Sequence, residues 1–337
     1  MINKGKEMRK WPSKFSRVPD EEWTKLPLEN LALKYDSVEH HGWYDNLDLT
    51  VQQVADRLKS NDIIIDYSGG TGIWTRRFLD KIPESENVGV IIVDSSPKFL
   101  RLAYDKFHDD SRVAFRLIKY LKNLKRLELL NEVIDNSVYQ IGVDKIISTN
   151  AIHLYYGLDQ TLQSWRDILK NGGEVFVQSG NIRNSKSESG SWIIDETVEE
   201  IHQVAIEIVQ SCDEYLQYRD CIKDKNYMNQ HDDLRKKYFL PVRDVEYYQD
   251  IFAKSKFKKV SCDVKTILAK VDDWYSFLEV YHEGVLGWIG GAEKITQKLP
   301  TNESINDRKA LMKLAMNKIF NSKDTFKASW TYMVYQK

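Results

Sequence analysis

The sequence predicts a doubly wound α/β fold, in which helices cover both faces of a mostly parallel sheet. Short apolar runs alternate with helical stretches between residues 60 and 182, and this alternation is typical of parallel strands that are buried on both faces. A glycine-rich turn follows the first run, and an acid ends the second. A chain of 337 residues is long enough for one such domain with sizeable insertions.

Residues 1–59 form a polar and aromatic extension, which we expect to fold as short helices. The core of the fold spans 60–182, and its expected strands are the apolar runs at 63–66, 88–93, 113–117, 144–149 and 174–178. The last of these strands is expected to begin after a turn at Gly172 and Gly173. Helices are expected between the strands, the second of them opening at Pro97.

The alternation stops after residue 182. Residues 183–240 are predicted to form a helical insertion, and residues 241–337 to complete the sheet around a second helical insertion at about 270–322. Both insertions are rich in Trp and Tyr, which predicts an aromatic-lined cap over a small acceptor. The alternative is that these aromatic rings simply pack the insertions onto the core.

Charge and cysteine usage restrict the partners. The chain has 49 basic and 50 acidic side chains, which leaves no overall field to attract nucleic acid or anionic lipid. Its three cysteines form no CxxC pair, which favours reduced thiols in the cytoplasm. The sequence shows neither an apolar leader segment nor a run of about eighteen apolar residues. We therefore expect a cytoplasmic protein without nucleic acid or membrane partners, and no oligomeric state is predicted.

The glycine-rich turn is the first chemical signal. Residues 63–72 read Ile-Ile-Ile-Asp-Tyr-Ser-Gly-Gly-Thr-Gly, and glycines there allow the backbone to approach a ligand beside the free N–H groups of the next helix. Asp94 lies 22 residues beyond Gly72, at the end of the next expected strand. An acid at this place accepts hydrogen bonds from ribose hydroxyls. The two features together indicate a nucleoside-containing ligand.

Two such ligands compete. A dinucleotide favours Gly-x-Gly-x-x-Gly/Ala, whereas this chain has Thr75 in the last place and bulky Trp74 beside it. The charge of Asp66 would oppose a pyrophosphate but suits a cationic amino-acid moiety. S-adenosylmethionine is therefore favoured over a nicotinamide dinucleotide, which would make the protein a dehydrogenase.

The turn resembles the first motif of class I S-adenosylmethionine-dependent methyltransferases, Asp/Glu-x-Gly-x-Gly-x-Gly, filled here by Asp66, Ser68, Gly70 and Gly72. Ser68 stands where the family usually has glycine. Asp94 and Ser95 resemble the second motif, in which the acid holds the ribose and its neighbour touches the adenine. Residues 144–154 and 169–177 are similar to the fourth-strand and fifth-strand motifs. The resemblance implies a seven-stranded Rossmann-like sheet with an antiparallel last strand.

The resemblance also implies which residues hold S-adenosylmethionine: Asp66, Ser68, Gly69, Gly70, Gly72, Asp94, Ser95 and Asn150. An acid that contacts the adenine amino group often follows the third strand of the family, and residues 117–120 contain none. Either Tyr120 stacks on the base, or the correspondence is shifted by a few residues. Tyr44 is expected to fold over the cofactor, as N-terminal segments do in similar enzymes, the alternative being an exposed turn.

The methyl group of a sulfonium is already activated, so the protein mainly aligns the acceptor and excludes water. A general base is needed only when the acceptor keeps its proton until late. His153, three residues beyond Asn150, is the candidate base, and a structural histidine is the alternative. Tyr155 and His282 are candidates for the acceptor site, although both also fit simple packing roles. The histidine spacing indicates no metal site, and we expect none.

We therefore expect transfer of a methyl group from S-adenosylmethionine to oxygen, nitrogen or carbon of a small molecule. A protein or RNA methyltransferase is one alternative, and it would need an open, basic acceptor face. The other is a relative that binds S-adenosylmethionine without transferring its methyl group, as a regulator or a cyclase-like enzyme.

Overall fold

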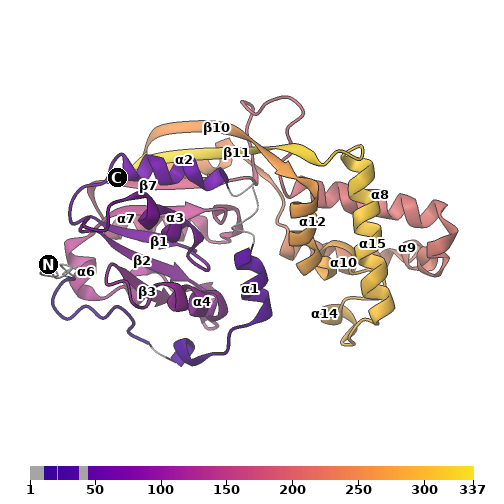
Figure 1. Ribbon diagram of the computed structural model, residues 1–337, viewed down its shortest axis with the longest axis horizontal. Coiled ribbons are helices and arrows are strands. Elements are labelled where there is room, and N and C mark those ends of the chain that lie inside the picture. Colours follow the sequence, from indigo (N-terminus) through magenta and orange to yellow (C-terminus); the bar gives the residue numbers. More distant parts are fainter. Residues whose placement is uncertain (1–10, 21, 38–44) are drawn as a thin grey trace, which may run out of the picture.

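A computed structural model describes residues 11–20, 22–37 and 45–337. Figure 1 shows two lobes side by side, one built around a sheet and one made of helices. The sheet has seven strands in the order β10-β11-β7-β6-β1-β2-β3. Their bounds are β1 Ile63–Tyr67, β2 Gly89–Asp94, β3 Val113–Leu117, β6 Val143–Thr149, β7 Leu169–Ser179, β10 Lys258–Lys270 and β11 Thr325–Gln336. β11 runs antiparallel to both neighbours and the other ladders are parallel, which confirms the predicted fold class.

The central strands β1 and β2 are mostly apolar because helices cover both faces of the sheet. Along β1, Ile64 joins one hydrophobic cluster, whereas Ile63 and Ile65 join the other. The first face is covered by α2 Asn46–Ala55, α3 Ile73–Lys81 and α4 Pro97–Phe107. The second is covered by α6 Asn136–Ile141, α7 Leu158–Ile168 and α11 Val245–Lys254. Every residue of β1 and β2 is buried as a result.

The two stretches that the sequence predicts as helical insertions pack together into one helical lobe (Figure 1). Its longer helices are α8 Glu196–Ser211, α10 Lys225–Tyr238, α12 Val271–Val280 and α15 Asn302–Ile319. Shorter elements complete it: η5 Asp213–Tyr218, α9 Arg219–Lys223, α13 His282–Leu286 and α14 Glu293–Thr296. α8 packs on α15, and α10 packs on α13. The long strands β10 and β11 lead from the sheet into this lobe.

The predicted start of the fifth strand is wrong. β7 begins at Leu169 rather than at residue 174, because Leu169 already pairs with Val143 before an irregularity shifts the register to Lys145 opposite Glu174. The expected turn at Gly172 and Gly173 is therefore a bulge inside the strand. β10 extends to Lys270, because backbone pairing with β11 continues that far.

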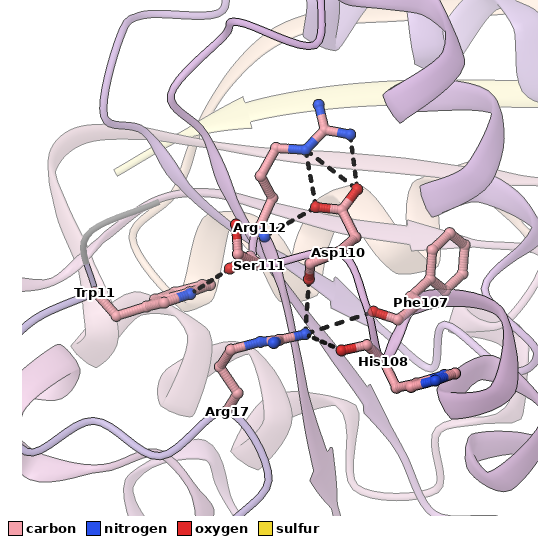
Figure 2. A network of polar contacts seen from close by, with 7 residues as sticks. All are labelled: Trp11, Arg17, Phe107, His108, Asp110, Ser111 and Arg112. Carbon is pink, nitrogen blue, oxygen red and sulfur yellow. Dashed lines mark hydrogen bonds and ion pairs between the residues drawn. The ribbon is translucent and has the colours of Figure 1, made fainter. Parts of the chain in front are cut away.

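The N-terminal residues 11–18 follow the edge strand β3. The backbone N–H of Phe115 donates to the carbonyl of Arg17 (2.8 Å), and the Trp11 indole donates to the Ser111 carbonyl (2.8 Å). The Arg17 guanidinium donates to the carbonyls of His108 (3.0 Å) and Asp110 (2.6 Å), just beyond α4, as Figure 2 shows. A cation at this place also interacts favourably with the negative end of the helix dipole. These contacts fix the path of the chain toward η1 Glu22–Lys25 and α1 Asn30–Ser37.

Helix α1 lies between the two lobes (Figure 1). Its Asp36 pairs with Lys106 of α4, and Glu29 just before it pairs with Lys98 (2.6 Å). These ion pairs hold α1 beside the carboxyl ends of the parallel strands. Across the part of the chain that the structure describes, no helix combines the length and the apolar character that crossing a membrane requires.

Candidate cofactor and acceptor sites

The glycine turn joins β1 to α3 and has a conformation that few residues adopt. Ser68, Gly70 and Gly72 have φ of +59°, +56° and +78°, in the left-handed region that glycine enters most readily. A Cβ atom on Gly69 would lie 2.8 Å from the Asp66 carboxyl, and one on Gly72 would lie 2.7 Å from the Phe107 ring. The two glycines are therefore needed for close packing, and the turn leaves its backbone open to a ligand.

Asp94 ends β2 and faces this turn. One carboxylate oxygen accepts a hydrogen bond from the Gly70 N–H (2.8 Å), and the other accepts one from the Ser96 N–H (2.7 Å). Burial raises the pKa of Asp94, while these backbone donors lower it. Each oxygen keeps acceptor capacity, so the side chain fits the two hydroxyls of a ribose. Ser95 follows it and is exposed.

Asp66 lies beneath the turn and is completely buried. Thr75 donates to one of its oxygens (2.6 Å), whereas the other has no hydrogen-bond partner among the described residues. Burial raises the pKa of Asp66 to about 7, against the opposing effect of the Thr75 hydrogen bond. The buried hydroxyl of Thr71 is also unpaired within the described chain. An unpaired carboxylate oxygen and hydroxyl beside an open turn fit a polar, partly cationic cofactor.

A cavity adjoins the turn between Tyr35 of α1, Leu47 of α2, the glycines and Asn150. The Tyr35 ring stacks on Phe99, with 4.8 Å between ring centroids. α1 therefore covers the cavity from the side of the helical lobe. Tyr44 lies outside the described residues.

Asn150 lines this cavity in a left-handed conformation with φ of +52°. The indole of Trp330 donates to its side-chain oxygen (2.8 Å), and its amide donates to Asn46 (3.3 Å). Gln178 also donates to Asn46 (3.0 Å). Sequence reasoning found Asn150 but missed its three supporting residues, because they come from the N-terminal extension and from strands far along the chain.

Tyr120, the candidate for stacking on the adenine, lies just beyond β3. Tyr120 lies in a short hairpin of β4 Tyr120–Leu121 and β5 Arg126–Leu127, and it is 59% exposed. The Lys119 N–H donates to the carboxylate of Glu128 (2.7 Å). An acid thus lies beside the residues after β3, although the sequence places it nine positions beyond Lys119.

His153 lies at the carboxyl end of the sheet, but both of its ring nitrogens are engaged. The Asn181 amide donates to Nε2 (3.0 Å), so Nδ1 carries the proton and donates to the Ser179 hydroxyl (3.1 Å). Burial lowers the pKa of His153 to about 4, with a smaller contribution from Arg243. This environment favours a neutral, hydrogen-bonded histidine.

The other two catalytic candidates lie in different surroundings. The Tyr155 hydroxyl lies 2.9 Å from the Ser68 hydroxyl and 3.0 Å from that of Ser148, next to the cofactor turn. His282 starts α13 in the helical lobe, where its ring faces the buried Arg308 (3.4 Å). The structure thus brings Tyr155 to the cofactor turn and places His282 inside the helical lobe.

A second cavity, of about 280 Å³, lies between the helical lobe and the short parallel pair of β8 Ile182–Arg183 and β9 Arg243–Asp244. Its walls contain the acid Asp195, the ion pair of Arg235 with Glu199 (2.8 Å) and the ring of Phe239. Sequence reasoning missed Asp195, which stands in an ordinary polar stretch before α8.

Two chains of contacts join this cavity to the cofactor turn. On one side, Asn181 accepts from the Asp195 N–H (2.9 Å) and donates to His153, which follows the cofactor-lining Asn150. On the other side, aromatic rings form a row between the cavities, with centroid distances of 6.4 Å for Phe239–Tyr281, 5.1 Å for Tyr281–Phe277 and 6.4 Å for Phe277–Tyr35. Hydrogen bonds and ring contacts thus link the second cavity to the cofactor site through intervening residues. Among the described residues, no three histidine, cysteine or acidic side chains gather to hold a metal ion.

Comparison with known proteins agrees with this geometry. The model of the ubiE/COQ5 methyltransferase family matches residues 29–191, a range that includes the glycine turn, Asp94 and Asn150. The crystal structure of the YcgJ protein from Bacillus subtilis has a TM-score of 0.50 with this chain at 10% identity, and the match covers 87% of this chain and 98% of that one. This likeness shows a shared fold.

Two curated relatives match about a third of the chain. The hybrid PKS-NRPS synthetase apdA of Emericella nidulans is 31% identical over 115 residues, which are 34% of this chain and 3% of the synthetase. Polyketide synthase 19 of Gibberella fujikuroi is 28% identical over 114 residues, which are 34% of this chain and 4% of the synthase. The chain therefore spans only a small part of these relatives.

Proposed function

Because the chain belongs to the class I S-adenosylmethionine-dependent methyltransferases, we propose that it transfers the methyl group to a small organic acceptor held between its two lobes. The protein is an enzyme, and S-adenosylmethionine is its cofactor. The observation that carries the proposal is the second cavity, which two chains of contacts link to the cofactor site. Its volume of about 280 Å³ is close to the lower end of the range of small-molecule sites, which suits a small acceptor.

The residues around the turn would hold the cofactor in defined roles. Asp94 would accept hydrogen bonds from the ribose, the glycine turn would allow close approach of the backbone, and Asp66 would attract the cationic amino-acid end. When bound, S-adenosylmethionine supplies a methyl group that its sulfonium has already activated. Tyr35 and the row of aromatic rings would exclude water from the path between the two cavities.

Asp195 would accept the proton of the acceptor. The cationic side chains in the cavity wall already have acidic partners, since Arg183 pairs with Glu196 and Arg235 with Glu199. The ion pairs that the structure describes do not include Asp195, and burial raises its pKa to about 7. A carboxylate with this pKa is suited to general base catalysis near neutral pH. We therefore propose that the acceptor is an amine or a hydroxyl compound.

His153 would position Asp195 rather than act as the base itself. Both of its ring nitrogens are engaged, and its pKa of about 4 keeps it neutral. His153 accepts a hydrogen bond from the Asn181 amide. This contact orients the Asn181 oxygen toward Asp195, at the start of α8. We also propose that the enzyme works in the cytoplasm, which the free thiols of Cys212, Cys221 and Cys262 support.

The proposed function is tested with S-adenosylmethionine that carries an isotopically labelled methyl group. The purified protein is incubated with a panel of small amines and phenols, and in parallel with bulk tRNA and with a protein mixture. We expect label in the small-molecule fraction, at a rate that rises with pH up to about 7 as Asp195 ionises. Label only in tRNA or protein, or no label in any fraction, would contradict the proposal.

Variants of the second cavity locate the acceptor. Asp195→Asn and Phe239→Ala should each lower kcat/KM at least tenfold, while calorimetry shows unchanged binding of S-adenosylhomocysteine. Asp213→Asn, in the same lobe with a side chain that is 87% exposed, is the matched control and should match the wild type. If both cavity variants keep the kcat/KM of the wild type, as the control does, the acceptor binds elsewhere.

A further inference from the structure

Ser68 occupies a backbone conformation that serine seldom adopts. Its φ is +59°, where a Cβ atom crowds the backbone and glycine is preferred. It is the first residue after β1, and Gly69 and Gly70 follow it directly. The path of the whole cofactor turn therefore depends on what keeps Ser68 in this conformation.

A relay of hydroxyl groups reaches Ser68 from the neighbouring strand. Tyr155 donates its hydroxyl hydrogen to the Ser68 oxygen (2.9 Å). Because a tyrosine has one hydroxyl hydrogen, the contact of 3.0 Å between Ser148 and Tyr155 must be donated by Ser148. Ser148 lies in β6 and is completely buried. The relay thus runs in one direction from β6 to the cofactor turn.

The tyrosine ring is fixed by its neighbours. It packs edge-on against Tyr67, with 5.6 Å between centroids, and against Trp165, with 6.1 Å. Burial also raises the pKa of the Tyr155 hydroxyl well above its usual range. The Tyr155 hydroxyl therefore stays protonated. The tyrosine cannot shift without moving the rings packed against it.

We propose that the relay Ser148–Tyr155–Ser68 holds the cofactor turn in its binding conformation, which makes Tyr155 a positioning residue for S-adenosylmethionine. The hydrogen bond from Tyr155 offsets the strain that a serine introduces at this point. It also sets the place of Gly70, whose N–H lies 2.8 Å from Asp94. This inference depends on the cofactor and is independent of the proposed acceptor.

Substitutions at Tyr155 and Ser68 separate the relay from simple packing. Tyr155→Phe keeps the ring but removes the donor, and we expect the calorimetric Kd for S-adenosylhomocysteine to rise about tenfold. Ser68→Ala keeps a Cβ atom at the strained position but removes the acceptor, and it should weaken binding by a similar factor. Ser68→Gly removes the strain as well, so it should bind at least fivefold more tightly than Ser68→Ala.

The double variants decide whether the two residues act through each other. In the Ser68→Gly background, Tyr155→Phe should change the Kd by less than twofold, because the hydroxyl no longer has a strained partner to hold. Tyr156→Phe, at a neighbouring ring that is 79% exposed, is the control and should bind like the wild type. Thermal unfolding of each variant identifies any loss that comes from instability alone.

Three results would overturn the inference. The first is wild-type affinity in Tyr155→Phe. The second is equal affinity of Ser68→Ala and Ser68→Gly. The third is the same tenfold loss from Tyr155→Phe in both backgrounds, since the tyrosine would then act independently of Ser68. If Tyr155→Phe does not fold, the comparison of alanine with glycine at position 68 still decides the question.

Discussion

Replacing Asp66 by asparagine tests whether the buried carboxyl beneath the glycine turn serves binding at the expense of stability. One oxygen accepts from Thr75, and the other lacks a partner among the residues described. Burial raises the pKa of this carboxyl from 3.8 to about 7. The folded protein therefore holds the Asp66 proton more tightly than the unfolded chain does.

The sign and size of the effect follow from linkage. A carboxyl whose folded pKa is raised contributes stability at low pH that is lost as the pH rises from about 3.8 to about 7. The gap between these two pKa values corresponds to about 4 kcal/mol, of which about 3 kcal/mol lies between pH 5 and pH 8. Asparagine stays neutral and avoids this loss. Its amide group would face the unpaired position, which costs about 1–2 kcal/mol at every pH.

The assay is urea unfolding of the cofactor-free protein at pH 5 and at pH 8. We expect the free energy of unfolding of Asp66→Asn, relative to that of the wild type, to rise by about 3 kcal/mol from pH 5 to pH 8. The other titrating groups cancel in this comparison. Asp220→Asn, with a side chain that is 93% exposed and paired with Lys223, is the control and should show the same difference at both pH values.

Binding should change in the opposite direction. At pH 8 the variant should bind S-adenosylmethionine at least tenfold more weakly, because it no longer offers a negative charge to the cationic end of the cofactor. A stability difference that is equal at both pH values would refute the assignment of the raised pKa to Asp66. Wild-type affinity in the variant would refute its role in binding.

Three further substitutions test the surroundings of the site. Arg17→Ala should lower the free energy of unfolding in urea by about 2 kcal/mol, because Arg17 donates to carbonyls at the end of α4; an unchanged unfolding midpoint would count against this. His231→Leu should stabilise the protein more at pH 5 than at pH 7. Burial lowers the pKa of His231 to about 4, whereas the unfolded histidine gains its proton near pH 6.5, so the wild type loses stability as the pH falls. Urea unfolding at the two pH values measures this, and equal effects would disprove it. Trp330→Phe should raise the calorimetric Kd for S-adenosylhomocysteine at least fivefold, because its indole donates to Asn150 (2.8 Å); Trp192→Phe is the control, and equal Kd values would refute the role.

The sheet could be predicted because its signals are local. A strand that is buried on both faces needs consecutive apolar residues, and both β1 and β2 have them. The glycine turn and Asp94 could be found for the same reason, since each follows directly from the end of a strand. The start of β7 could not be found, because Gly172 and Gly173 resemble a turn and only pairing with β6 reveals the bulge.

The parts of the site that escaped prediction depend on contacts between distant segments. Asn150 is supported by Trp330, which is 180 positions away in the chain. Asp195 becomes a candidate base only because the folded chain brings it to Asn181 and a cavity. Tyr155 became a candidate because it closely follows β6, but its contact with Ser68 spans 87 positions. No pattern in the sequence reports such pairs.

Calorimetric titration with S-adenosylmethionine, S-adenosylhomocysteine and NADH tests the central claim most directly. We expect micromolar binding of both sulfur nucleosides and none of NADH. Asp94→Ala should weaken the binding of both nucleosides at least tenfold, which corresponds to about 1.4 kcal/mol, because the variant lacks the side chain that would hold the ribose. Tight binding of NADH, or binding of neither sulfur nucleoside to the wild type, would contradict the assignment of the glycine turn and the function built on it.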